Sequence, residues 1–482
     1  MPTPERGSEW WRDAVFYQVY VRSFADSNGD GIGDLPGLTG KLAYLDELGV
    51  DAIWLTPFYP SPQVDHGYDV ANYVDVEPTY GTLDDFDDLI AAAHERGIRV
   101  IVDIVPNHSS AQHPWFTGDR SRYVTVPSAD NRTPPNNWPS NWGGPAWTYD
   151  KERGHWYLHL FAPEQPDLDW HNPQVRDDFE EILRFWLDRG VDGFRIDVAH
   201  GLVKDKQLRD EPAPFPTVRF SSDWRTAIDQ PEVHEVYRDW HRLAAEYEGD
   251  RVLVGEVVFS DQRRVAPYLR PDELQLAFNF SLIFQPWDAE KLRESIEASL
   301  RELPIVTWVF ENHDVTRIVT RFGGEQHARA AALLLLALPG PVFVYQGQEL
   351  GLEEVDLPDG ARQDPVFFQT KGERKGRDGC RVPIPWTRGL EPNAWLPQPA
   401  AWSEKSVEAQ TGDAAAFLEL YRRALVLRPH GAFAWRESPT GVLAFDRDDL
   451  TCVVHFGDER LPLDGEIVLA SDAENTAVWL RR

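Results

Sequence analysis

The chain has 482 residues, of which 42% are hydrophobic, 48 are Lys or Arg and 79 are Asp or Glu. This hydrophobic share is ample for a large folded core, so wholesale disorder is excluded. The formal net charge of −31 repels phosphate groups, and we therefore expect neither a nucleic-acid partner nor binding to an anionic membrane surface.

Apolar, β-branched segments alternate with amphipathic segments along most of the chain. The strands are predicted at Val15–Val21, Ala52–Leu55, Ile98–Ile104, Gly193–Ile196, Val252–Gly255, Leu274–Phe280, Val306–Phe310 and Val342–Tyr345. The helices between them are predicted at Leu38–Leu48, Leu83–Glu95, Phe179–Leu187, Val233–Tyr247, Ala289–Leu300 and Gln326–Leu338. Near-continuous apolar strands separated by helices are typical of a parallel sheet covered on both faces. Eight such strands predict an α/β fold, a closed (β/α)8 TIM barrel.

Two segments interrupt this alternation. Residues 109–172 are rich in Pro, Asn, Gly and Trp and show no long helical pattern, which predicts an irregular domain inserted after the third strand. After a predicted helix at Ala414–Leu427, closely spaced strand signals predict a small antiparallel β domain at the C-terminus. The predicted organisation is residues 1–108 for the first part of the barrel, 109–172 for the inserted domain, 173–430 for the rest of the barrel and 431–482 for the β domain.

Three features predict a cytoplasmic protein. Cys380 and Cys452 are too few for a disulfide framework or a metal cluster and are expected to be free thiols. The first 13 residues lack the apolar core of a signal peptide. The longest apolar run, residues 330–339, is about half of the length that a membrane span needs.

Ionisable side chains follow four of the predicted strands, at the end of a barrel where catalysis takes place. They are Asp103 and His108, Arg195 and Asp197, Glu256, and His313 and Asp314. Each alone could simply mark where a strand meets water. Together, and without a Cys/His cluster or a phosphate-binding glycine loop, they indicate carboxylate chemistry. Glycosidic cleavage needs such a set, because one carboxylate attacks the anomeric carbon and a second carboxyl protonates the leaving oxygen.

Four motifs resemble the α-amylase family of glycoside hydrolases (family 13). They are DIVPNH at 103–108, GFRID at 193–197, GE at 255–256 and ENHD at 311–314. The resemblance implies that Asp197 is the nucleophile, Glu256 the general acid/base and Asp314 the transition-state stabiliser. It also implies that His108, Arg195 and His313 surround the terminal non-reducing glucose.

Other motifs resemble the oligo-1,6-glucosidase and α-glucosidase branch of this family. VDHGYD at 64–69 is similar to its sugar-binding loop, which implies that Asp65 binds hydroxyls and that Tyr68 stacks on the ring. QPDLDW at 165–170 is similar to a signature of its inserted domain, and Phe161 before it is expected to form an apolar wall. The insertion also carries four tryptophans that we expect partly in its core and partly at the rim of the pocket: Trp138, Trp142, Trp147 and Trp156.

Two further residues concern the substrate. RDGCRVPIPW at 377–386 resembles a branch element that places Arg381 near Asp65, where the pair would clamp the terminal 4- and 6-hydroxyls. The alternative for Arg381 is a surface ion pair. By the same resemblance, Val198 after the nucleophile favours α-1,6 linkages, whereas Thr or Ala there favours α-1,4. Because Val198 is equally explained by packing at a strand end, both linkages stay open.

The segment from Asp26 to Asp34 reads DSNGDGIGD, with oxygen-bearing residues at alternate positions and Gly at the turn, as Ca²⁺ requires. It is not an EF-hand, because Gly37 stands where that loop carries Glu. It resembles the Ca²⁺ loop of the oligo-glucosidase branch, which implies a structural ion bound by the side chains of Asp26, Asn28, Asp30 and Asp34 and the carbonyl of Ile32. The alternatives are Mg²⁺, or an acidic turn capped by its own side chains.

The resemblance and the residues together predict a retaining exo-acting α-glucosidase. It would release terminal α-linked glucose from short oligosaccharides or disaccharides through a covalent glucosyl-enzyme intermediate, with transglucosylation as a side reaction. The alternative is an α-glucosyl-transferring isomerase of the sucrose or maltose type, for which Arg317–Arg321 after the seventh strand was the segment to compare. A non-catalytic barrel would lack these carboxylates and carry a membrane anchor. The expected partner is a small α-glucoside, and the oligomeric state stays open.

Overall fold

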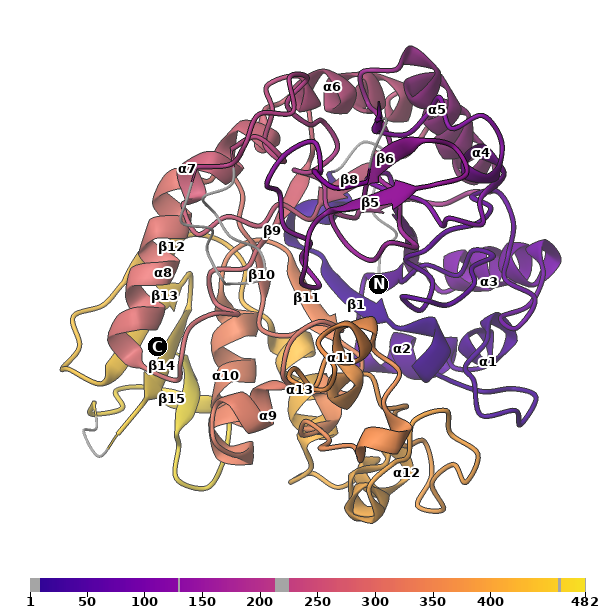
Figure 1. Cartoon of the computed structure of the whole chain (residues 1–482). Helices are drawn as coiled ribbons and strands as arrows, with labels where there is room; N and C mark the ends of the chain where they lie inside the picture. The colour runs from indigo at the N-terminus through magenta and orange to yellow at the C-terminus, as the bar shows by residue number, and fades with distance from the viewer. Residues whose placement is uncertain (1–8, 129–130, 213–224, 458–460, 482) are drawn as a thin grey trace.

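The computed structural model describes residues 9–128, 131–212, 225–457 and 461–481. Eight parallel strands close a barrel in the order β1-β11-β10-β9-β8-β7-β3-β2, which confirms the predicted α/β barrel (Figure 1). The strands are β1 (Val15–Val19), β2 (Ala52–Leu55), β3 (Arg99–Ile104), β7 (Gly193–Ile196), β8 (Val252–Gly255), β9 (Leu276–Asn279), β10 (Thr307–Val309) and β11 (Val342–Tyr345).

The barrel interior is filled with aromatic rings. Phe16 of β1 stacks on Phe343 of β11 with ring centroids 4.4 Å apart, and Trp54 of β2 packs against Phe278 of β9 at 5.5 Å. Such inward-pointing side chains make the centre of a barrel a packed core and leave its rim for chemistry. The helices outside it are α1 (Leu35–Thr39), α2 (Leu42–Leu48), α3 (Leu83–Glu95), α5 (Pro173–Asp188), α6 (Val233–Ala244), α8 (Ala289–Glu302), α10 (Glu325–Ala337) and α13 (Phe417–Leu427).

The segment inserted after β3 is more regular than its sequence predicts. Besides the short helix α4 (Pro114–Thr117), it contains a three-stranded antiparallel sheet in the order β4-β6-β5. The strands are only three or four residues long: β4 (Thr125–Pro127), β5 (Trp147–Asp150) and β6 (His155–Leu158). Figure 1 shows this segment in purple and magenta over one side of the barrel.

The C-terminal residues form the predicted antiparallel β domain, a five-stranded sheet in the order β12-β13-β14-β16-β15. Its strands are β12 (Phe433–Trp435), β13 (Val442–Arg447), β14 (Leu450–His455), β15 (Glu466–Ala470) and β16 (Ala477–Arg481). The domain packs on the barrel helix α10, where the indole of Trp479 donates a hydrogen bond to the carbonyl of Leu333 (3.2 Å).

A second long segment, residues 346–416, joins β11 to α13 and was not singled out from the sequence. It contains the short helices α11 (Pro365–Gln369) and α12 (Val407–Gln410) and several 3-10 turns. It is tied to the chain after β1, because the indole of Trp386 donates to the carbonyl of Phe24 (2.6 Å) and the N–H of Ile384 donates to the carbonyl of Ser23 (3.1 Å). These two hydrogen bonds hold residues 346–416 beside the C-terminal rim of the barrel.

Both cysteines are unbridged, as predicted, and both are buried. Among the helices of the described ranges, none combines the length and the apolar content that a membrane crossing needs.

Candidate active site

The barrel backbone fixes two carboxylates at its C-terminal rim. The N–H of Asp197, directly after β7, donates to the carbonyl of Ile104 at the end of β3 (2.9 Å). The N–H of Glu256, directly after β8, donates to the carbonyl of Ile196 at the end of β7 (2.9 Å). The parallel hydrogen-bonding pattern therefore continues one residue beyond β7 and β8. It places Asp197 and Glu256 side by side, at the same height on the barrel rim.

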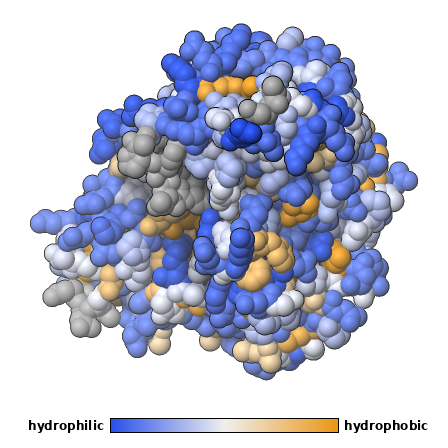
Figure 2. All heavy atoms as spheres, viewed as in Figure 1, coloured by the Kyte–Doolittle hydropathy of each residue, from blue (hydrophilic) through white to orange (hydrophobic). Residues whose placement is uncertain are grey.

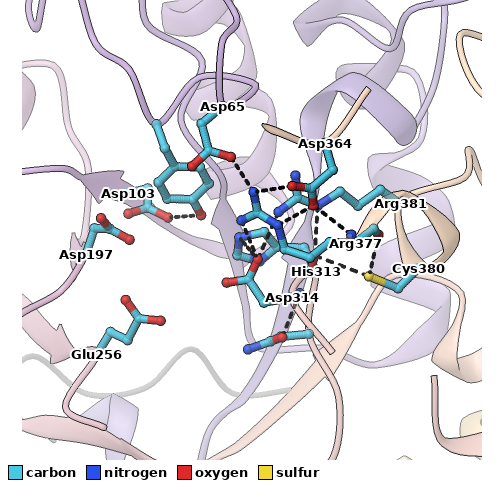
Figure 3. Close-up of polar contacts among 12 residues, drawn as sticks. Asp65, Asp103, Asp197, Glu256, His313, Asp314, Asp364, Arg377, Cys380 and Arg381 are labelled. Carbon is cyan, nitrogen blue, oxygen red and sulfur yellow. Dashed lines mark hydrogen bonds and ion pairs between the residues drawn. The ribbon is translucent and has the colours of Figure 1, made fainter. Parts of the chain in front are cut away.

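One guanidinium joins three carboxylates at this rim. Arg195 Nη1 donates to Asp197 Oδ1 (2.7 Å) and to Asp103 Oδ1 (3.0 Å), and its Nη2 lies 3.0 Å from Glu256 Oε1. All four side chains are buried, and Figure 3 shows the carboxylates of Asp197 and Glu256 turned toward the same space. The residues on both sides of Glu256 in the sequence are apolar, but in space its carboxylate faces Arg195.

Burial outweighs the shared guanidinium in setting the pKa values of this cluster. Burial raises the pKa of Asp197 well above its ordinary value, and the nearby Glu256 and Asp103 add to this, whereas Arg195 opposes it. Burial likewise raises the pKa of Asp103 to about 7. Because three carboxylates share one positive charge, their protonation is coupled, and a change of charge on one of them alters the pKa of the others.

Val198 contributes its backbone as well as its side chain. Its φ of 45° is in the left-handed region, which a β-branched residue rarely adopts. In this conformation its N–H donates to Glu256 Oε2 (2.9 Å). The strained turn thus holds the second oxygen of Glu256, a typical place for backbone strain in a functional site.

The closed end of the site is a buried ion-pair cluster that we call the end wall, made of Asp65, Asp364 and Arg377. Arg377 Nη2 lies 2.5 Å from Asp65 Oδ1 and its Nε lies 2.6 Å from Asp364 Oδ2, while its Nη1 reaches Asp314 Oδ1 at 3.0 Å (Figure 3). Burial raises the pKa of Asp65, against the effect of Arg377. The segment 346–416 therefore supplies the cation that faces the loop after β2.

The direct partner of Asp65 is thus Arg377. Arg381 lies near enough to lower the pKa of Asp65, as its predicted position implies, but the predicted direct ion pair between the two is wrong. Arg381 instead donates from Nη2 to Asp314 Oδ1 (2.9 Å) and from Nε to the carbonyl of His313 (2.8 Å). The two arginines flank the 3-10 turn at Asp378–Cys380. Both reach Asp314 Oδ1, but only Arg377 also pairs with Asp65. Arg381 is fully buried, so the alternative of a surface ion pair is also excluded.

Two rings are held rigidly beside these carboxylates. Tyr68 stacks on His313 with centroids 5.3 Å apart and planes 3° from parallel, and its hydroxyl donates to Asp103 Oδ2 (3.0 Å). Burial lowers the pKa of His313 well below its usual range, so the ring is neutral. The amide of Gln18 lies 2.6 Å from His313 Nδ1. An amide nitrogen at Nδ1 is compatible with a proton on Nε2, the ring nitrogen that lies 3.8 Å from Asp314 Oδ1.

A narrow pocket lies between these groups, with a volume of about 30 Å³. This space holds about two water molecules. Of the residues predicted from the sequence, the pocket is lined by Asp65, Tyr68, His108, Phe161, Asp197, Val198, Glu256, His313 and Asp314. Arg195 and Arg381 lie behind these residues and hold their carboxylates. Trp142, from the insertion, and Arg377, which the sequence analysis missed, also line the pocket.

A buried lysine, also missed, ties the insertion to the rim of the barrel. Lys204 Nζ lies 2.8 Å from Asp167 Oδ2 of the insertion and donates to Asn107 Oδ1 (2.6 Å). The amide nitrogen of Asn107 in turn lies 3.0 Å from Nδ1 of His108. Burial lowers the pKa of His108 to about 4, so this ring is also neutral. The sequence shows a lysine seven residues after the predicted nucleophile, but nothing in the sequence shows that this lysine is buried.

The loop predicted to bind a cation carries its oxygen donors on one exposed turn. Three side-chain oxygens each accept the N–H two residues further along the chain, at 2.9 Å: Asp26 Oδ1 from Asn28, Asn28 Oδ1 from Asp30 and Asp30 Oδ1 from Ile32. Asp34 Oδ1 accepts the N–H of Gly37 (2.6 Å) and so caps α1. Carboxylate and amide oxygens of this kind suit a hard cation, although Asp26 already accepts the N–H groups of Asn28, Gly29 and Gly31. However, the described ranges contain no group of three or more His, Cys, Asp or Glu side chains arranged to hold a metal.

The chain matches the family model described as alpha amylase, catalytic domain, over residues 18–435. It is 39% identical to a probable alpha-glucosidase of Rhizobium meliloti (strain 1021), with 95% of this chain and 90% of the relative covered. It is 35% identical to an oligo-1,6-glucosidase of Parageobacillus thermoglucosidasius, with 87% and 83% covered.

Solved structures show the same relationship. The crystal structure of the alpha-glucosyl transfer enzyme XgtA matches with a TM-score of 0.90 at 37% identity, and 98% of each chain is covered. The trehalulose synthase MutB from Pseudomonas mesoacidophila MX-45 matches with a TM-score of 0.86 at 33% identity, over 94% of this chain and 92% of that one. With the predicted motifs assembled around one pocket at the rim of a closed barrel, the chain belongs to the α-amylase family of glycoside hydrolases.

Proposed function

We propose that this protein is a retaining exo-acting α-glucosidase that releases the terminal non-reducing glucose of short α-glucosides. The observation that carries the proposal is the pair Asp197 and Glu256 on one guanidinium, in a pocket that a buried ion-pair wall closes at one end. In retaining glycosidases the two carboxyls are about 5–5.5 Å apart, against about 6.5–9.5 Å in inverting ones. Bridging by a single Arg195 favours the shorter separation.

In this proposal Asp197 attacks the anomeric carbon and Glu256 protonates the leaving oxygen. Glu256 then takes a proton from the water that hydrolyses the glucosyl ester. Positive charge develops on the sugar in the transition state, and ionised carboxylates beside Arg195 stabilise it more than they stabilise the neutral ground state. Asp314, held by Arg377 and Arg381, is the third carboxylate and binds sugar hydroxyls as that charge develops.

The end wall supports exo-action. Asp65 and Arg377 line the pocket at the end opposite the catalytic pair, as Figure 3 shows. A terminal hydroxyl can hydrogen-bond to both groups, whereas a further sugar at that position would have to displace a buried ion pair. Tyr68 and Phe161 supply apolar faces for the ring.

The main alternative is transfer of the glucosyl group to form an isomeric disaccharide, which the similarity to MutB supports. The arginine-rich segment after β10 does not favour it. Arg317 is fully buried and donates to the carbonyl of Cys380 (2.9 Å), and Arg321 Nη1 donates to the carbonyl of Gln285 (3.2 Å). Because both guanidinium groups donate hydrogen bonds to backbone carbonyls outside the pocket, they add no positive charge at the acceptor side of the pocket.

The test is an initial-rate comparison on maltose, isomaltose, sucrose, trehalose and soluble starch, followed by proton NMR. We expect the disaccharides with accepted linkages to release glucose as the α-anomer first, and starch to react far more slowly. Val198 lines the pocket beside the predicted nucleophile, and the ratio of maltose to isomaltose rates decides the open linkage preference. First release of β-glucose would contradict retention, and an isomeric disaccharide as the main product would establish the alternative.

We also propose a structural Ca²⁺ in the loop Asp26–Asp34, supported by its run of oxygen donors and by its position. This loop leads directly into α1, whose first turn is capped by Asp34. Asp26, Asn28, Asp30 and Asp34 would hold the ion by side chains and Ile32 by its carbonyl. The ion would stabilise the loop and take no part in glycosidic cleavage.

Removal of this ion is expected to lower the melting temperature by several degrees without changing the products of the reaction, because a ligand of the folded state alone stabilises it by mass action. The measurement is a thermal melt in excess chelator, in added Ca²⁺ and in added Mg²⁺. Asp30→Ala, at an exposed position, should remove the difference. Identical melts under all three conditions would show that the turn is held by its own side chains.

A further inference from the structure

A second hollow lies behind the end wall, and we call it the outer groove. Its volume is about 600 Å³, and it is lined from three parts of the chain: the loop after β2, the inserted domain and the α11 region. Val64 in the groove directly precedes Asp65 in the pocket, and Gln363 in the groove directly precedes Asp364. The groove and the catalytic pocket are therefore the two sides of one wall.

The lining of the groove is amphipathic and almost free of charge. Pro145 and Phe368 provide apolar surface, whereas Trp147 borders the groove but is only 2% exposed. Three glutamines, at 63, 363 and 369, provide amides. Glu164 is the one acidic residue in this lining, in a chain of which 26% is charged. Amides both donate and accept hydrogen bonds, so this surface suits an uncharged ligand with many hydroxyls and an apolar face.

Phe368 is the most unusual member of this lining, since 60% of it is exposed. Figure 2 shows an apolar patch, where Figure 1 places α11, on a face that is otherwise largely hydrophilic. Among the residues that the structure describes, neither the side chain of Gln369 nor that of Glu164 forms a hydrogen bond with another protein group. An exposed ring beside uncommitted polar groups is the composition of a small-molecule site, and 600 Å³ falls within the usual range of about 300–1,000 Å³.

The ring is also held in place. Asp364 Oδ1 accepts the N–H of Val366 (2.8 Å) and so caps α11, while Oδ2 of the same carboxylate accepts Arg377 Nε (2.6 Å). The helix that carries Phe368 is thereby fixed to the end wall, and binding in the groove would not have to order a loose segment.

We propose that the outer groove is a second, non-catalytic binding site for a neutral oligosaccharide. The ring of Phe368 covers one apolar sugar face, and the amide of Gln369 binds hydroxyls at its edge. The neighbouring Gln363 amide also donates to the carbonyl of Trp395 (3.3 Å), so it contributes less. The site is separate from the catalytic pocket because the end wall lies between them. It goes beyond the proposed function, because it does not depend on which bond the pocket cleaves.

The test uses the wild-type enzyme with its pocket filled by saturating 1-deoxynojirimycin. A maltotriose analogue with sulfur in its glycosidic bonds, which resists cleavage, is then titrated by calorimetry and observed by saturation-transfer NMR. We expect residual binding with one site per chain. Phe368→Ala should weaken it by about tenfold or more, and Gln369→Ala should weaken it less. The matched control is Val426→Ala on α13, an apolar residue that is 80% exposed and outside the groove, and it should leave binding unchanged.

Two results would overturn the proposal. One is the loss of all analogue binding once the iminosugar fills the pocket, and the other is residual binding that is the same in Phe368→Ala, Gln369→Ala and wild type. Sedimentation at several concentrations tests a different occupant. A dimer that Phe368→Ala dissociates would show that the groove receives a second copy of the chain and not a sugar. Equal melting temperatures of the variants confirm that they fold.

Discussion

Asp197→Asn is expected to lower kcat by about 10⁴-fold or more while sugar binding is largely retained. An amide cannot form the glucosyl ester, and loss of a nucleophile typically has an effect of this size. The replacement keeps the shape of the side chain, and its oxygen can still accept the hydrogen bond from Arg195 Nη1 that the carboxylate accepts at 2.7 Å. The measurements are kcat on the best substrate of the panel and the affinity for maltose or isomaltose by calorimetry.

A matched control separates this effect from a general change. Asp88→Asn makes the same chemical change at an exposed position of α3, and it should leave kcat and affinity unchanged. As a positive test, Asp197→Gly with azide and an activated aryl α-glucoside should yield β-glucosyl azide, because azide takes the place of the missing nucleophile. A near-normal rate in Asp197→Asn, or α-glucosyl azide as the product, would exclude the assigned role.

Arg377→Ala is expected to be the most damaging change outside the catalytic pair. It leaves Asp65 and Asp364 buried without their cation, and removal of one partner from a buried ion pair costs about 3–5 kcal/mol. We expect the free energy of unfolding to fall by about this amount, and kcat/KM to fall by about 10²-fold or more because the terminal hydroxyls lose their clamp. Urea unfolding and initial rates measure the two effects.

The effect of Arg377→Ala on stability should depend on pH in a defined direction. Burial raises the pKa of Asp364, but Arg377, Arg381 and hydrogen bonds lower it well below its usual range. In the wild type this carboxylate therefore stabilises the fold above a pH of about 4. Without Arg377, burial dominates and the pKa of Asp364 rises, so the variant regains stability as the carboxylate is protonated. The difference in unfolding free energy should be larger at pH 7 than at pH 4.5.

Two other arginines serve as controls. Arg388 forms an exposed pair with Glu404, and Arg388→Ala should cost less than about 1 kcal/mol, as surface pairs do. Arg381→Lys tests the partner that the sequence favoured for Asp65. It should leave the Asp65 clamp intact and affect Asp314 instead. If Arg377→Ala proved as mild as Arg388→Ala, the end wall would not be the group that closes the pocket.

The barrel could be predicted because each strand is an apolar run between polar or glycine residues. Ala52–Leu55, Gly193–Ile196, Val252–Gly255 and Val342–Tyr345 have the predicted bounds in the structure. The sheet of the insertion was missed, because its strands span three or four residues and carry Trp, Tyr and His, which do not alternate clearly. Short strands of this kind are defined by tertiary contacts more than by local pattern.

The pocket residues could be predicted where a strand end or a motif fixes the position of the side chain. Contacts between distant segments could not. Arg377 and Arg381 are four residues apart, and only the intervening turn decides which of them faces Asp65. Glu256 has apolar neighbours along the chain but Arg195 in space. Lys204 lies under the insertion, a position that depends on how two domains pack.

The end wall has a consequence for how the enzyme would respond to mixtures of substrates. If only a free chain end can enter, the reaction rate follows the number of chain ends and not the mass of carbohydrate present. A heavily branched polymer would then react faster, gram for gram, than a linear one of the same composition, and a cyclic glucan would be inert. The buried contact between Arg377 and Asp65 would thus make the rate of glucose release depend on how branched the polysaccharides in a mixture are.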